Sequence, residues 1–124
     1  MNLTDTDTTD RKFQKDLNAG IAALVLLGVL SRAAAPMYGY QIAKLIEEGR
    51  KEVPTIKQGT LYPVLRSLES SGLLESQVEP SVSGPPRRYY SITESGRQTL
   101  ERWAWIWEQT KSYVDSILKG DSDD

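Results

Sequence analysis

The chain has 124 residues, 39% of them hydrophobic and 26% charged, which is the composition of one soluble globular domain. It contains no cysteine, which excludes disulfides and thiolate chemistry, and no histidine, which removes the commonest general base and metal ligand. We therefore expect no metal, no cofactor and no enzymatic activity. The longest apolar run, residues 21–30 (IAALVLLGVL), is much shorter than the roughly 20 residues of a membrane span, so we expect a buried helix in a cytoplasmic protein.

The net charge of −2 is distributed unevenly along the chain. Residues 1–10 carry three acids and no base, and residues 120–124 carry three more acids. We expect acidic tails at both ends, the first of them disordered, because neither segment has apolar periodicity. Between residues 11 and 119 stand 15 basic and 11 acidic side chains, a net charge of +4 that permits binding to phosphates.

Apolar residues spaced three and four apart predict a helix from about residue 11 to residue 32 and a second helix over residues 38–48. Pro36 cannot continue the first helix, and Gly49 is placed to end the second. A third helix is predicted to begin at a capping box, with Thr55 as the cap and Gln58 three residues later. It should end near Ser71 and bury the apolar residues that recur at helical spacing, Ile56, Leu61, Leu65 and Leu68.

Two strands and a last helix complete the predicted order of elements. Residues 73–78 and 87–92 are strand-like, and residues 79–86 between them hold three prolines and form a loop. The last helix should run over residues 93–118, with Gly120 as its cap.

The predicted fold is mainly α, within the α+β class: a winged helix-turn-helix with a two-stranded wing and a long C-terminal dimerisation helix. Residues 11–92 would form the DNA-binding domain and residues 93–119 the dimerisation helix.

Four segments carry a family resemblance, in order and at the right spacing. They are YGYQIAKLI (38–46), GTLYPVLRSLESSGLL (59–74), GPPRRYYSIT (84–93) and ESGR (94–97). From about residue 21 to residue 118 the chain resembles the PadR-like transcriptional regulators, and its length suits their smaller subtype. The resemblance implies a homodimer built on the last and first helices, a two-fold operator in double-stranded DNA, and repression. Lys57 departs from the family pattern, which often has a small capping residue there, and this leaves the start of the third helix open.

The third helix presents the candidate DNA contacts. With its leucines facing inward, Gln58, Tyr62 and Arg66 face outward at a spacing of four, flanked by Lys57 and Thr60. A glutamine can read adenine edges, lysine and arginine can neutralise phosphates, and hydroxyls can donate to phosphate oxygens. The alternative is an ordinary solvated helix face, and the family resemblance favours DNA contact.

Arg87 and Arg88 follow a Gly-Pro-Pro turn, which places two guanidinium groups near the tip of the predicted wing. This suits phosphate or minor-groove contact; the alternative is a charged edge strand that prevents aggregation. Lys44, Arg50 and Lys51 are weaker candidates, because neighbouring glutamates cancel much of their field.

The last helix carries an apolar stripe that a small domain cannot cover by itself. A second copy of the chain would cover the residues of this stripe, which are Leu100, Trp103, Trp107, Thr110, Val114 and Ile117. By resemblance, Trp107 with Trp103 is also a candidate site for a small hydrophobic, aromatic effector; the alternative is that both only fill the interface. Trp105 points to the opposite side and should pack on the first helix or on that of a partner.

These patterns predict a sequence-specific DNA-binding transcriptional regulator. The alternative is a winged-helix module that assembles with other proteins and binds no operator.

Overall fold

The helices and strands follow the predicted order, with one short strand added. The computed structural model describes residues 3–49 and 56–120. The elements are α1 (Leu3–Ser31), β1 (Met37–Tyr38), α2 (Gly39–Glu48), α3 (Gln58–Ser70), β2 (Leu74–Glu79), β3 (Arg87–Ile92) and α4 (Glu94–Lys119). The winged helix-turn-helix predicted from the sequence is confirmed.

The wing belongs to a small antiparallel sheet with the strand order β1-β3-β2. On one side of β3, Leu74 pairs with Ile92 and Glu79 with Arg87; on its other side, Met37 pairs with Tyr90. The wing is therefore the two-stranded hairpin expected, extended at its base by a third strand. That strand has two residues, too few for an alternating pattern to reveal it.

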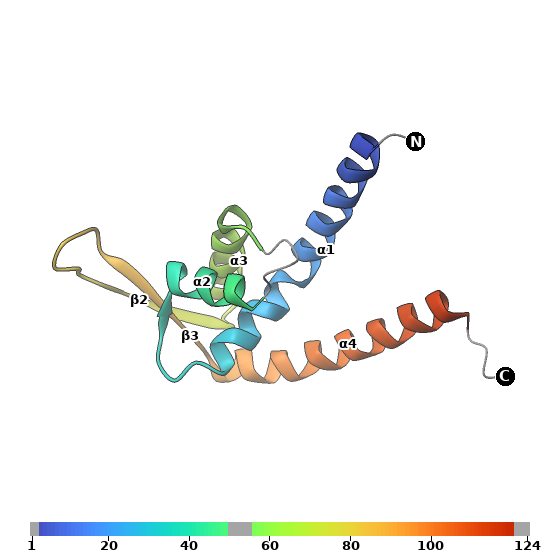
Figure 1. Cartoon of the computed structure of the whole chain (residues 1–124). Coiled ribbons are helices and arrows are strands. Elements are labelled where there is room, and N and C mark those ends of the chain that lie inside the picture. The colour runs from blue at the N-terminus through green and yellow to red at the C-terminus, as the bar shows by residue number, and fades with distance from the viewer. Residues whose placement is uncertain (1–2, 50–55, 121–124) are drawn as a thin grey trace.

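The core lies where α1, α2, α3 and the base of the sheet meet (Figure 1). The wing projects from one side of this core, whereas the N-terminal half of α1 and most of α4 extend from the other side (Figure 1). Met37 of β1 and Leu100 and Trp103 of α4 are partly buried against this core. The buried apolar members of the core are Ala22, Leu26, Leu27, Leu30, Ile42, Ile46, Ile56, Leu61, Leu65, Leu68, Leu73, Leu74 and Tyr90.

Over Thr6–Ser31, α1 is long and apolar enough to cross a membrane by length and composition alone. The central helix of a soluble protein has the same properties. Here Leu26, Leu27 and Leu30 are buried against the other elements, which is the role predicted for the apolar run.

The expectation of a disordered tail over residues 1–10 is wrong for residues 3–10, because α1 begins at Leu3. Two ion pairs link side chains one helical turn apart. Arg11 pairs with Asp7 at 3.2 Å, and Lys12 pairs with Asp16 at 2.9 Å. Acidic side chains are also favourable near a helix N-terminus, where the helix dipole is positive. At the other end, residues 121–124 of the expected tail lie outside the described residues.

The predicted start of the third helix is also wrong. α3 begins at Gln58, and Lys57 is its N-cap residue without a side-chain cap hydrogen bond. Ile56 is buried as predicted, but it enters the core from the segment before the helix and not from the helical stripe. Thr55, Arg50 and Lys51 lie outside the described residues.

Candidate nucleic-acid interface

The outward face of α3 is the one predicted from its leucine spacing. Gln58, Tyr62 and Arg66 are exposed, while Leu61 and Leu65 on the opposite face are fully buried. Lys57 is exposed at the N-cap, and Thr60 is half-buried. The face therefore offers an amide, hydroxyl groups and two cationic groups to a partner.

The register of the wing places Arg87 and Arg88 at the end of β3 next to the loop over residues 80–86. Both side chains are exposed. The Arg87 guanidinium lies over the ring of Tyr38, 4.5 Å from its centroid, and this cation–π contact limits its motion. The Arg88 Nη1 donates a hydrogen bond to the Ser76 Oγ at 2.9 Å. Each wing arginine is thus held by a neighbour.

Three tyrosines form a cluster at the base of the wing that the sequence did not predict. Tyr38 contacts Tyr89 edge to face at a centroid distance of 5.4 Å and stacks on Tyr40 at 6.5 Å. The signal lay in the tyrosines of YGY (38–40) and RRYY (87–90), which the β1–β3 pairing brings side by side. Because Arg87 rests on Tyr38, the cluster supports one of the candidate DNA contacts.

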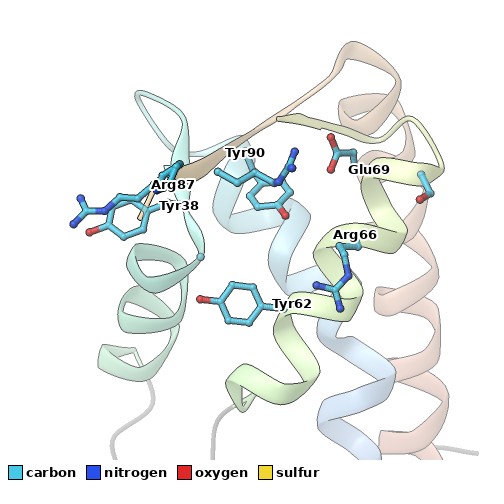
Figure 2. Close-up of a pocket in the computed structure, with 10 residues that line it drawn as sticks. Tyr38, Tyr62, Arg66, Glu69, Arg87 and Tyr90 are labelled. Carbon is cyan, nitrogen blue, oxygen red and sulfur yellow. The ribbon is translucent and has the colours of Figure 1, made fainter. Parts of the chain in front are cut away.

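A cavity of about 600 Å³ separates α3 from the wing (Figure 2). Its lining comes from four elements and includes Tyr38, Gly39, Tyr62, Arg66, Glu69, Ser70, Pro86, Arg87, Arg88 and Tyr90. The structure therefore brings Tyr62 and Arg66 of the third helix and both wing arginines to one hollow. Gln58, Lys57 and Thr60 are not part of its lining.

A polar chain connects α3 to the wing beside this cavity. The Ser76 Oγ on β2 donates to the Glu69 Oε2 at 2.5 Å and accepts from Arg88. Tyr90, 4% exposed, lies next to the chain, and its pKa is raised, first by burial and then by the Glu69 carboxylate, against the opposing effect of Arg88 and Arg66. Its hydroxyl therefore stays protonated and able to donate a hydrogen bond at neutral pH.

The apolar stripe of α4 divides into two parts. Leu100 and Trp103 pack against the core of the same chain, whereas Trp107 is 41% exposed, and Val114 and Ile117 are exposed as well. Thr110 is also exposed.

Near Trp103 and Trp107, α1 and α4 border a groove of about 540 Å³. The expectation that Trp105 packs on the first helix of its own chain is wrong. The side chain is 65% exposed, because α1 contacts the opposite side of α4.

The match to protein families decides the class of the chain. The model of the transcriptional regulator PadR-like family matches residues 26–102, more than half of the chain. The chain belongs to the PadR-like family. It is a DNA-binding transcriptional regulator of that family, as the sequence predicted.

Other PadR-like and related regulators are similar in sequence and structure. A transcriptional regulator of Mycobacterium tuberculosis is 37% identical over 91 residues, which cover 73% of this chain and 75% of that protein. The crystal structure of a PadR family transcriptional regulator from Eggerthella lenta superposes with a TM-score of 0.79 at 30% identity, covering 93% and 96% of the two chains. A transcriptional regulator from Clostridium thermocellum gives a TM-score of 0.72 at 30% identity, covering 82% and 93%. These relatives are named as regulators and not as enzymes.

Proposed function

We propose that this PadR-like regulator is a cytoplasmic homodimeric repressor that binds a two-fold operator through α3 and the wing. One observation carries the proposal: Tyr62 and Arg66 on the exposed face of α3 border the same cavity as the wing arginines. Two elements on one side of a fold can follow a duplex, one in the major groove and one along the backbone or in the minor groove.

Each predicted contact has a chemical role in this proposal. Gln58 reads a base edge in the major groove, because a glutamine amide can both donate to and accept from adenine. Lys57 and Arg66 pair with phosphates, and the hydroxyls of Tyr62 and Thr60 donate to phosphate oxygens. The half-burial of Thr60 makes it the least accessible of these groups.

Arg87 and Arg88 supply the wing contact. Both are exposed and held in place, Arg87 by Tyr38 and Arg88 by Ser76. Within the described residues, the ion pairs lie on α1 and α4, and none joins these two arginines to a carboxylate. Their positive charge is therefore available to DNA.

The test is a gel shift with the duplex that lies upstream of the gene for this chain. The wild type should give a sequence-specific complex at moderate salt, and the double change Arg87→Ala and Arg88→Ala should weaken it at least about tenfold, because charge-assisted contacts are lost. As a control matched in charge, Arg11→Ala with Lys12→Ala removes two cations from the far end of α1 and should leave the affinity within about twofold.

Absence of a specific complex, together with no effect of the wing change, would instead favour the winged-helix module for protein assembly. That result would contradict the operator proposal.

An aromatic effector at the tryptophans of α4 is the second part of the proposal. The groove between α1 and α4 is lined by Trp103 and Trp107 together with apolar residues of α1, among them Leu17, Ile21 and Leu24. A mostly apolar hollow that holds the exposed indole ring of Trp107 suits a flat hydrophobic ligand. Since the groove adjoins the exposed part of α4, an occupant there would affect how two copies pack, and this would release the operator.

Quenching of tryptophan fluorescence by a planar aromatic dye tests the effector site. The wild type should show saturable quenching that Trp107→Ala abolishes. Trp105→Ala is the matched control, because Trp105 does not line the groove, and it should keep the quenching. Saturable quenching that survives Trp107→Ala would place the dye elsewhere.

A further inference from the structure

The cavity between α3 and the wing carries an excess of positive charge. Three arginines line it, Arg66 from α3 with Arg87 and Arg88 from β3, against one carboxylate, that of Glu69. Glu69 also accepts the Ser76 hydroxyl at 2.5 Å, so part of its hydrogen-bonding capacity is already used. A hollow with this balance suits a small anion with several acceptor oxygens.

Arg66 and Arg88 act on the same part of the cavity. Both guanidinium groups influence Tyr90, whose pKa each of them lowers in opposition to burial. The ring of Tyr90 directs its hydroxyl toward the space that Tyr62 and Arg66 border (Figure 2). Two cations from different elements and a protonated hydroxyl therefore surround one space.

Arg88 is placed there by a chain of hydrogen bonds that starts on α3. Glu69 accepts from Ser76, and Ser76 in turn accepts from the Arg88 guanidinium at 2.9 Å. The serine hydroxyl has one proton, which it donates in the hydrogen bond to Glu69. The lone pairs of the serine oxygen are then left to accept from the arginine. The chain ties the wing to α3 across β2 and sets the direction of the Arg88 side chain.

We propose that this cavity is a binding site for a single phosphodiester group of the DNA backbone, held jointly by Arg66 and Arg88, with Ser76 and Glu69 as positioning residues for Arg88. The inference rests on the proposed DNA binding and adds the stoichiometry of one phosphate for two arginines. It also assigns a role to Ser76 and Glu69, which point to each other and need not touch the DNA.

The salt dependence of binding counts the phosphates, because each neutralised phosphate contributes about 0.9 to the slope of log affinity against log salt concentration. The probe is a duplex of random sequence, so no operator needs to be known. Arg66→Gln and Arg88→Gln should each weaken binding about tenfold and lower the slope by about one. The double variant should also lower the slope by about one and not by two, because the one phosphate is neutralised only when both arginines are present.

Arg11→Gln is the control for loss of one positive charge, since Arg11 lies on the far part of α1 and should leave the slope unchanged. A slope reduced by two in the double variant would overturn the shared site. The shared site would also be overturned if Arg66→Gln and Arg88→Gln gave the same slope as the control. In that case the wild-type slope would still support DNA binding. A wild type with no affinity for the duplex would overturn both proposals.

A double-mutant cycle tests the positioning chain. Ser76→Ala should weaken duplex binding several-fold when Arg88 is present and have no further effect in the Arg88→Gln background. Ser76→Thr keeps a hydroxyl and should restore most of the affinity. Additive losses in the cycle would show that Ser76 acts independently of Arg88 and would overturn its positioning role, and urea unfolding of each variant separates a folding defect from this result.

Free phosphate is the other source of the same chemistry. With the duplex bound, inorganic phosphate should displace no more DNA than sodium chloride at equal ionic strength. Phosphate that binds to the duplex complex without displacing DNA, and that no longer binds in Arg66→Gln, would assign the site to a free phosphate ion and overturn the DNA assignment.

Discussion

Gly39, the first residue of α2, lies directly against the ring of Tyr62 on α3. A Cβ atom built at this position would overlap the Tyr62 Cε1 and hydroxyl oxygen. The absence of a side chain at Gly39 therefore allows Tyr62 to lie across the start of α2 and border the cavity. A glycine is needed here for space, and not for an unusual backbone angle.

Gly39→Ala should force Tyr62 to rotate or α2 to move away. The expected result is weaker duplex binding with a loss of at most about 1 kcal/mol in the free energy of unfolding, because the exposed Tyr62 ring can move away at a lower cost than a residue of the core. Fluorescence anisotropy with labelled duplex measures the first effect and urea denaturation the second.

Gly28→Ala in α1 is the matched control, because nothing lies within 4 Å of the Cβ position. It should leave stability unchanged or raise it by up to about 1 kcal/mol through helix propensity. If Gly39→Ala behaved like this control, the contact with Tyr62 would not matter.

At the scale of elements, α4 is joined to the rest of the fold by Thr93. The Thr93 Oγ1 accepts the Gly96 N–H at 2.9 Å, which caps the helix, and donates to the Gly72 carbonyl oxygen at 2.7 Å. The Thr93 N–H also donates to the Leu73 carbonyl oxygen at 3.1 Å. One residue thus caps α4 and anchors it to the turn between α3 and β2.

Thr93→Ala should lower the free energy of unfolding by about 1–2 kcal/mol, because the cap and the carbonyl of Gly72 both lose a partner. Thr93→Ser keeps the hydroxyl and should restore most of the loss. Urea unfolding followed by circular dichroism distinguishes these variants. Equal stability of Thr93→Ala and the wild type would contradict the capping role.

The ends of elements show how far sequence patterns reach. The residues at 87–92 were predicted as a strand with the bounds that β3 has, and α4 ends before Gly120, which adopts the left-handed conformation of a helix cap. The starts of α1 and α3 differ from the predicted ones: α1 begins at Leu3, in the acidic segment, and α3 begins at Gln58, after the buried Ile56. Ends are decided by competing interactions of about 1 kcal/mol, whereas the body of a helix is decided by its apolar stripe.

At the scale of the whole molecule, α4 and the N-terminal half of α1 extend away from the core and expose apolar side chains (Figure 1). On α4 these include Ile106, Val114 and Ile117, the last of them 63% exposed. An exposed apolar helix face of this length is typical of a subunit interface, and a second copy of the chain would bury it.

Ile117→Asp should therefore weaken self-association by about 2–4 kcal/mol, because a charge would be buried at the interface. Analytical ultracentrifugation should show a dimer for the wild type and a larger fraction of monomer for the variant. Operator binding should weaken with it, since the two half-sites would no longer be bound by one linked pair of domains.

Ser112→Asp adds the same charge on the opposite side of α4 and should leave the dimer intact. A monomeric wild type, or equal dissociation of the two variants, would contradict the dimer.

The sequence by itself determined the order of the four helices and the two wing strands, the winged helix and the outward face of α3. These follow from spacings of two and of three to four residues, which depend only on neighbours along the chain. The tertiary structure alone decided which distant side chains meet: Arg87 on Tyr38, Tyr62 on Gly39, and Ser76 between Glu69 and Arg88. Such contacts depend on how the sheet is placed against α3, and no periodicity along the chain contains that information.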